Sequence, residues 1–161
     1  MRLEESTMRD GKKKQHMAQL TAGHITEAHY KKMIQTSMDG FLVYDIHGRI
    51  LDANDAYCKL IGCHREELLN NHVTDFEQFE KPEEIAKHFE KIMQPGSDRF
   101  VTRQKCKDGK VVDVEISVNY SKSNGGRYFA FLRDITDRIR LENELHSKEE
   151  TYRIFVENSP T

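Results

Sequence analysis

Apolar and β-branched residues form two short runs near residue 45. Phe41–Ile46 and Arg49–Ala53 have the composition of β-strands, and a glycine-containing turn separates them, so together they predict a hairpin. Asn54 follows where a helix N-cap belongs, and Asp55 stands in the first turn, where a negative charge is favourable. Gly62 ends the predicted helix, because glycine readily adopts the left-handed conformation of a helix stop.

Two further helices are predicted after this unit. His64–Asn70 has the composition of a short helix, and Pro82–Met93 begins with a proline at a favourable first position. Apolar and aromatic positions of the second helix fall on one face: Ile85, His88, Phe89, Ile92 and Met93.

The second half of the chain predicts two more hairpins. Arg99–Lys105 and Val111–Tyr120 flank Asp108–Gly109, a strong hairpin signal, and Asn124–Gly126 turns the chain into Arg127–Ile135. Strict alternation places Val112, Val114, Ile116 and Val118 on one buried face. The expected fold class is α+β: a five-stranded antiparallel sheet with helices inserted between strands 2 and 3.

Amphipathic helices flank this predicted sheet. Glu27–Thr36 carries an apolar stripe of Tyr30, Met33 and Ile34, and Thr136–Phe155 repeats apolar residues in a seven-residue pattern. The repeated positions are Leu141, Leu145, Tyr152 and Phe155. We expect the stripe of the second helix to be buried against a second copy, and the stripe of the first helix against a second copy or the outer surface of the sheet. This arrangement predicts a homodimer with a coiled-coil linker.

Composition sets the outer limits. The chain has 161 residues, 37% hydrophobic and 32% charged, with a formal net charge of -2. That charge gives no general attraction for nucleic acid or anionic membranes, and no apolar run approaches the roughly 20 residues that span a bilayer. Three cysteines at unrelated spacings argue against a disulfide framework. We therefore expect a cytoplasmic segment without nucleic-acid binding or membrane insertion.

No catalytic or metal-binding pattern stands out. Phosphate-binding loops, metalloprotease helices, nucleophile triads and the signatures of histidine kinases and cyclases are missing from the sequence. Cys58, Cys63 and His64 lack a fourth partner and match no zinc spacing, so no metal site is expected. The segment is expected to be regulatory and not an enzyme.

Two motifs resemble the PAS family of sensory domains. Asp39–Gly62, "DGFLVYDIHGRILDANDAYCKLIG", resembles the opening of that family, and Phe131–Arg138, "FLRDITDR", resembles its C-terminal PAC motif. The resemblance implies a PAS fold flanked by N-terminal and C-terminal signalling helices. It also implies that Asp134 and Thr136 couple the sheet to the output helix, with Asp134 as the cap of that helix.

The resemblance also organises the chain. We expect a flexible or helical arm over residues 1–25, a PAS domain over 26–135 and a signalling helix over 136–150. Residues 151–161 repeat the pattern of the N-terminal helix, with Tyr152 matching Tyr30, and predict the start of a second, truncated PAS-like domain.

Apolar faces converge on a predicted ligand pocket between the sheet and the long helix. Its expected residues are Tyr44, Ile85, His88, Phe89, Ile92, Phe100, Val114 and Ile116. The ligand is an unknown small molecule, or none. Flavin-binding relatives carry a reactive cysteine where Val73 stands, so no flavin adduct is expected. We favour a hydrogen-bonded or surface role for His88 over a role as haem ligand.

These observations lead to one main functional hypothesis and two alternatives. The main one is a sensory and interaction module of a two-component or similar phosphorelay system, which transmits a change through its C-terminal helix to a histidine kinase or diguanylate cyclase output domain. The first alternative is a redox or gas sensor with His88 as an axial ligand of haem. The second is a dimerisation module without a ligand.

Overall fold

The computed structural model describes residues 25–78 and 81–160. The chain divides into two units, Met1–Ile34 and Gln35–Thr161. Most of helix α2 (Glu27–Thr36) belongs to the first unit, and its bounds are those predicted from the sequence. None of its residues is buried. The arm predicted over residues 1–25 lies, except for Ile25, outside the described residues.

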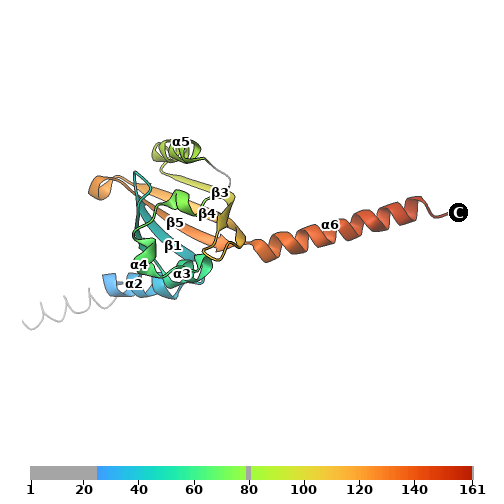
Figure 1. Ribbon diagram of the computed structural model, residues 1–161, viewed down its shortest axis with the longest axis horizontal. Helices are drawn as coiled ribbons and strands as arrows, with labels where there is room; N and C mark the ends of the chain where they lie inside the picture. Colours follow the sequence, from blue (N-terminus) through green and yellow to red (C-terminus); the bar gives the residue numbers. More distant parts are fainter. Residues whose placement is uncertain (1–24, 79–80, 161) are drawn as a thin grey trace, which may run out of the picture. The chain divides into compact units, whose positions relative to one another are not determined.

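The second unit contains a five-stranded antiparallel sheet with the strand order β2-β1-β5-β4-β3 (Figure 1). In chain order the strands are β1 (Gly40–Asp45), β2 (Ile50–Ala53), β3 (Ser97–Lys105), β4 (Val111–Ser121) and β5 (Arg127–Asp134). The fold class predicted from the sequence is confirmed. Strand ends differ by one or two residues: β1 stops before Ile46 because the Asp45 carboxylate accepts hydrogen bonds from the turn amides of His47 and Arg49, each at 2.9 Å.

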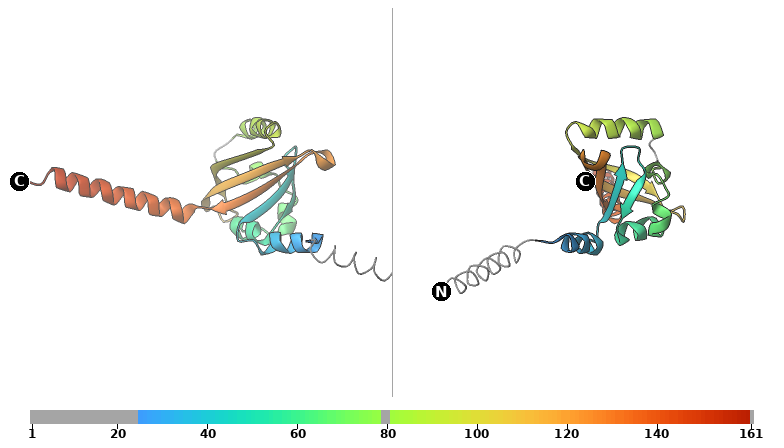
Figure 2. Two further views of the ribbon diagram at one scale, coloured as in Figure 1. Left: turned by 180° about the vertical axis from the view of Figure 1, so that it is seen from behind. Right: turned by 90° about the vertical axis from the view of Figure 1, so that its left-hand side faces the viewer.

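The three α-helices described between the second and third strands lie where the sequence predicts helical segments. They are α3 (Asp55–Ile61), α4 (Arg65–Leu68) and α5 (Pro82–Met93). A short 3-10 helix before α5, η1 (Val73–Asp75), was not predicted. The helix α4 is shorter than the predicted His64–Asn70, because the chain bends back so that the Asn71 carbonyl accepts a hydrogen bond from the Ile50 amide. The helices α3 and α4 contact each other near β1 and β2, while α5 contacts β3 and β4 (Figures 1 and 2).

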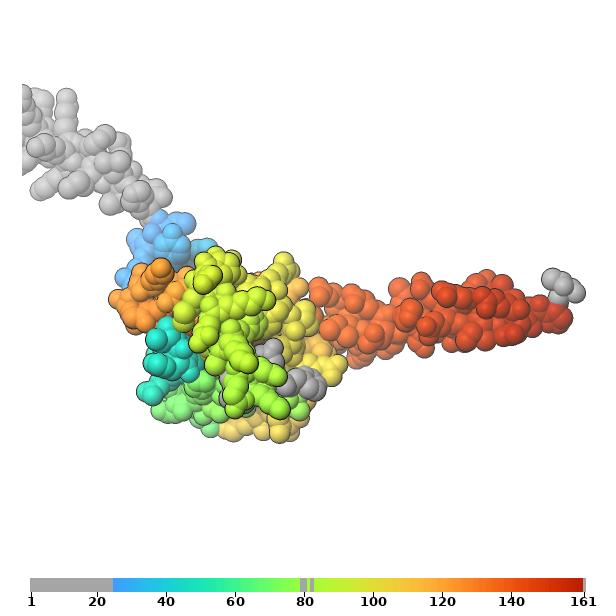
Figure 3. All heavy atoms as spheres, turned by 90° about the horizontal axis from the view of Figure 1, so that it is seen from above, coloured from blue at the N-terminus to red at the C-terminus, as the bar shows by residue number. Residues whose placement is uncertain are grey.

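The core lies between one face of the sheet and these helices. From β4, Val112, Val114, Ile116 and Val118 all point inward, as their alternation predicts. They meet Tyr57, Ile61 and Leu68 of α3 and α4, which are fully buried. Helix α5 covers this side of the unit and is seen from above in yellow-green in Figure 3.

Asn54 connects α3 to the start of the sheet. Its Oδ1 accepts hydrogen bonds from the Tyr57 amide, at 3.0 Å, and from the Phe41 amide, at 2.8 Å. Its Nδ2 donates to the Asp39 carbonyl at 3.0 Å. The helix ends at Gly62, whose φ of 77° is the left-handed conformation expected of a glycine stop. One fully buried side chain therefore fixes the helix start, the first strand and the residue that precedes it.

The last helix, α6 (Thr136–Glu157), is continuous across the boundary predicted at residue 150. No helix among the described residues is long and apolar enough to cross a membrane. The four residues of the predicted seven-residue pattern are exposed: Leu141 58%, Leu145 60%, Tyr152 71% and Phe155 71%.

Candidate functional site

A partly enclosed cavity of about 50 Å³ lies between the inner face of the sheet and α5. Its lining is mostly apolar, with three polar exceptions: Glu77, His88 and Gln104. The apolar part comes from Leu42, Tyr44, Val73, Ile85, Phe100, Ile116, Ala130 and Leu132. One water needs roughly 10–15 Å³ of such space, so the cavity holds about three to five water-sized groups.

Five of the eight residues predicted to form the pocket line this cavity: Tyr44, Ile85, His88, Phe100 and Ile116. The other three are not among its lining residues. Phe89 packs instead against the rings of Tyr44 and Tyr128, at centroid distances of 5.3 and 5.0 Å. Ile92 lies two helical turns beyond Ile85 and is buried in the core. Val114 of β4 is also fully buried, and it pairs with Asp134 at the end of β5.

Of the three polar lining residues, His88 was predicted from the sequence, whereas Glu77 and Gln104 were missed. Gln104 is only 5% exposed, and its Oε1 accepts a hydrogen bond of 3.4 Å from the Tyr57 hydroxyl. The Glu77 carboxylate accepts a hydrogen bond of 2.7 Å from the Thr102 hydroxyl. Inward-facing residues of β3 alternate as Asp98, Phe100, Thr102 and Gln104, and this alternation is the signal that could have identified Gln104.

His88 is engaged by a neighbouring carboxylate. Its Nε2 lies 2.8 Å from Oδ2 of Asp98, and its ring packs against Phe100 at a centroid distance of 4.4 Å. The hydrogen bond from His88 holds the pKa of Asp98 below its ordinary value. In this arrangement one ring nitrogen of His88 is used to join α5 to β3.

A second contact joins α5 to the middle of the sheet. The Tyr128 hydroxyl donates a hydrogen bond of 2.8 Å to the Phe89 carbonyl, and the Tyr128 ring stacks on Tyr44 at 5.1 Å. Burial raises the pKa of Tyr128 to about 12, so the hydroxyl keeps its proton at neutral pH. Together with His88, this contact sets the position of α5 over the cavity.

The strand-to-helix junction differs in one respect from the prediction. Ile135, not Asp134, occupies the N-cap of α6, because strand-like pairing continues to Ile135, whose amide donates to the Asp113 carbonyl at 2.9 Å. Asp134 still accepts a hydrogen bond of 2.9 Å from the Thr136 amide. The Thr136 hydroxyl in turn accepts one of 3.0 Å from the Asp113 amide. Asp113 of β4 thus bonds with the first helical residue and with the residue before it.

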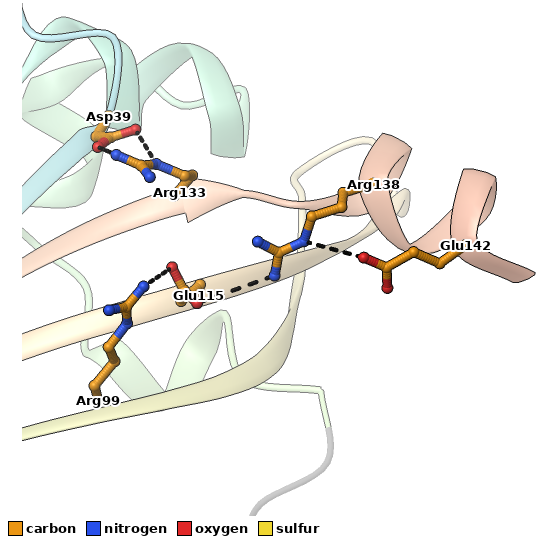
Figure 4. Close-up of polar contacts among 6 residues, drawn as sticks. All are labelled: Asp39, Arg99, Glu115, Arg133, Arg138 and Glu142. Atoms are coloured by element: carbon orange, nitrogen blue, oxygen red, sulfur yellow. Dashed lines mark hydrogen bonds and ion pairs between the residues drawn. The ribbon is translucent and has the colours of Figure 1, made fainter.

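Ion pairs surround the same junction (Figure 4). Glu115 of β4 lies 2.7 Å from Arg99 of β3 and 4.0 Å from Arg138 in the first turn of α6. Arg138 also lies 3.8 Å from Glu142, one turn further along the helix. The hydrogen bond from Arg99 lowers the pKa of Glu115, so this carboxylate stays charged.

A further ion pair ties the segment before β1 to the end of β5. Arg133 donates two hydrogen bonds to Asp39, at 3.1 and 2.8 Å, and stands directly opposite Glu115 in the sheet (Figure 4). Alternating charges therefore run from Asp39 through Arg133 and Glu115 to the first turn of α6. Sequence analysis identified Asp134 and Thr136 at this place but missed these partners, which come from four separate segments.

Cysteine and metal chemistry have no assembled site in the described part of the chain. Cys58, Cys63 and Cys106 are free thiols, and burial raises the pKa of each. Residues 25–78 and 81–160 contain no group of three or more metal-ligating side chains.

The sheet order, the inserted helices and the cavity beneath α5 define a small α+β domain with a C-terminal helix. The family model described as "PAS fold" matches residues 28–135, and the chain belongs to the PAS family. Solved PAS domains share the fold. The PAS domain of an HTR-like protein from Haloarcula marismortui superimposes with a TM-score of 0.63 at 21% identity, covering 77% of this chain and 99% of that one.

Curated relatives are much longer proteins. An uncharacterized protein of Azorhizobium caulinodans is 32% identical over 134 residues, which is 78% of this chain and 18% of that protein. Sporulation kinase E of Bacillus subtilis is 24% identical over 135 residues, which is 84% of this chain and 18% of the kinase. The chain thus spans less than a fifth of the length of these relatives.

Proposed function

We propose that this PAS domain detects a small molecule or a partner and transmits the change to α6 through the contacts of Asp113 with Ile135 and Thr136. The observation that carries the proposal is this pair of hydrogen bonds, at 2.9 and 3.0 Å, which joins the beginning of β4 to the start of the helix. A shift of β4 would move or release the first turn of α6. A two-state output needs only a few kcal/mol of bias, which contacts of this kind can supply.

The downstream partner is proposed to be a histidine kinase or diguanylate cyclase domain in the same protein, and the PAS segment itself is regulatory. Similarity to sporulation kinase E supports a kinase output. A cytoplasmic homodimer is part of the proposal. The exposed apolar residues of α6 support dimerisation, since a helix of this kind gains stability by burying such a stripe against a second copy.

A haem-binding sensor is the alternative, because His88 does line the cavity. Two observations favour the main proposal over it: Nε2 of His88 is bonded to Asp98, and a cavity of about 50 Å³ is far smaller than the several hundred Å³ of common cofactor sites. Val73 lines the cavity where a flavin adduct would need a thiol. A visible absorption spectrum of the purified protein tests this point, since a Soret band would favour the haem sensor.

The coupling is tested by fusing residues 1–161 to the dimerisation and catalytic domains of a histidine kinase and measuring autophosphorylation. Thr136→Val keeps the side-chain shape but removes the acceptor for the Asp113 amide. Loss of one such hydrogen bond is worth about 1 kcal/mol, which allows up to a roughly fivefold change in basal activity. Thr151→Val is the matched control, because Thr151 is exposed on the same helix and its hydroxyl donates to the Ser147 carbonyl of that helix.

Altered kinase activity in Thr136→Val, with a thermal melt close to that of the parent and an unchanged Thr151→Val control, supports transmission through the junction. Wild-type activity in the Thr136→Val fusion would contradict it. That result would favour a dimerisation module in which the hydrogen bonds of Asp113 with Ile135 and Thr136 carry no signal.

A further inference from the structure

Gln104 offers the cavity a hydrogen-bond donor that the described part of the protein leaves unused. Gln104 is 95% buried, and its Oε1 accepts a hydrogen bond from the Tyr57 hydroxyl. Burial raises the pKa of Tyr57 far above its ordinary value, so this hydroxyl remains a donor. Within residues 25–78 and 81–160, Nε2 of Gln104 donates to no protein group. Every fully buried polar side-chain atom in that part of the chain has a partner. This nitrogen therefore faces accessible space, and the space beside Gln104 is the cavity.

An unused donor in an apolar surrounding is costly unless something accepts its hydrogen bond. Most of the surrounding wall is apolar, from residues such as Leu42, Ile116, Ala130 and Leu132. A molecule that fits this wall needs one acceptor atom directed at Gln104 and an apolar remainder.

The charge of one lining residue and the size of the cavity narrow the class of possible ligands further. The Glu77 carboxylate also lines the cavity, and its charge repels anions. A volume of about 50 Å³ is well below the roughly 150 Å³ that holds benzene in an engineered apolar cavity. Planar cofactors and aromatic metabolites are too large for it.

We propose that the cavity binds a compact, neutral molecule of about three to five non-hydrogen atoms whose carbonyl or hydroxyl oxygen accepts a hydrogen bond from Gln104. Small amides, ketones, aldehydes and alcohols belong to this class. The inference rests on the proposed sensory function in taking the cavity as the site where the signal is detected.

Four probes of equal size separate the chemical possibilities. Acetamide is neutral with an acceptor oxygen, acetate is its anionic analogue, acetamidinium is its cationic analogue, and acetone offers only an acceptor. Each is added to the ¹⁵N-labelled chain and followed by the amide shifts of residues around the cavity. Ligands this small bind weakly, so we expect dissociation constants of about 0.1–10 mM for acetamide and acetone. We expect much weaker binding of acetate, which the Glu77 carboxylate repels, and of acetamidinium, which has no acceptor atom for Nε2 of Gln104.

Two variants and a control assign the binding to the cavity. Gln104→Met removes the donor while keeping the length of the side chain, and it should weaken acetamide binding at least tenfold. Ala130→Val fills space in the cavity without changing a polar group and should have the same effect. Gln78→Met makes the same substitution at an exposed position that does not line the cavity, and it should bind like the parent.

Saturable shifts for acetamide and acetone that both variants remove would support the ligand class. Absence of saturable shifts at about 100 mM, roughly ten times the weakest expected dissociation constant, would overturn it. Tighter binding of acetate or acetamidinium than of acetamide would also overturn it while leaving the cavity as a binding site. Neither result bears on the Thr136→Val fusion, so failure of the ligand class and failure of signal transmission are distinguishable.

Discussion

Replacing Asn54 by alanine should destabilise the domain far more than loss of an ordinary helix cap. The substitution removes three hydrogen bonds at once: two accepted from the amides of Tyr57 and Phe41, and one donated to the Asp39 carbonyl. Asn54 is fully buried, so water cannot easily replace these bonds.

The expected loss can be worked out bond by bond. Loss of the cap on the Tyr57 amide costs about 1 kcal/mol. Leaving the Phe41 amide buried without an acceptor costs about 1–2 kcal/mol, and the bond to the half-buried Asp39 segment adds about 0.5–1 kcal/mol. The total is about 3 kcal/mol, a large part of the roughly 5–15 kcal/mol that stabilises a domain, and it lowers Tm by roughly 10 °C.

Urea unfolding followed by circular dichroism measures this loss. Asn54→Ser should recover about 1 kcal/mol, because serine caps the helix but its short side chain cannot also reach the Phe41 amide. Asn70→Ala is the matched control, since the exposed Asn70 side chain donates a single hydrogen bond of 3.0 Å, to the Glu66 carbonyl, and it should change stability by less than about 0.5 kcal/mol. A loss below about 1 kcal/mol for Asn54→Ala, or full stability of Asn54→Ser, would refute the reasoning.

Three other predictions concern α5, acid stability and assembly. Phe89→Ala should cost about 2–3 kcal/mol in urea unfolding, below the full core value because the ring is only partly buried, whereas Val101→Ala at an exposed strand position should cost under about 0.5 kcal/mol; equal losses would mean that α5 does not pack as described. The pKa of Asp98 is depressed in the folded state, so its contribution to stability is present above the unfolded value of about 3.9 and is lost as pH falls through the folded pKa; unfolding between pH 6 and 2 should show a smaller acid loss in Asp98→Asn, and an unchanged slope would contradict the pairing. Asp substitutions at Met33 and Ile34 should shift sedimentation toward the monomer, whereas an unchanged mass would remove α2 from the interface.

Local signals in the sequence were sufficient to predict most of the architecture. Asn54 and Gly62 mark the ends of α3 through interactions within a few residues, and alternation in β4 reports which side chains face the core. Pro82 at the first position and the amphipathic pattern that follows it give the bounds of α5 as Pro82–Met93. Each of these signals is a cap, a stop or a repeat within one element, which the sequence displays directly.

The site was only partly predictable because its contacts join distant segments. The cap of α6 falls on Ile135, one residue after the prediction, because a strand more than twenty positions earlier pairs with it. The same limit applies to Gln104, which meets Tyr57 across 47 residues. Phe89 shows a further limit. Helix periodicity placed Phe89 on the correct face of α5, but this periodicity could not show that the ring packs against Tyr44 and Tyr128 and does not line the cavity.

The ring cluster beneath α5 offers an optical reporter. Phe89 meets the stacked rings of Tyr44 and Tyr128, and the chain contains no tryptophan. A Phe89→Trp variant would therefore carry a single indole at the place where α5 contacts the sheet, and its emission could be excited without background from another indole. Because indole emission depends on the polarity around the ring, its wavelength and intensity would record whether α5 stays seated on the tyrosines or lifts away. Helix movement could thus be followed in real time, in the intact chain and without a chemical label.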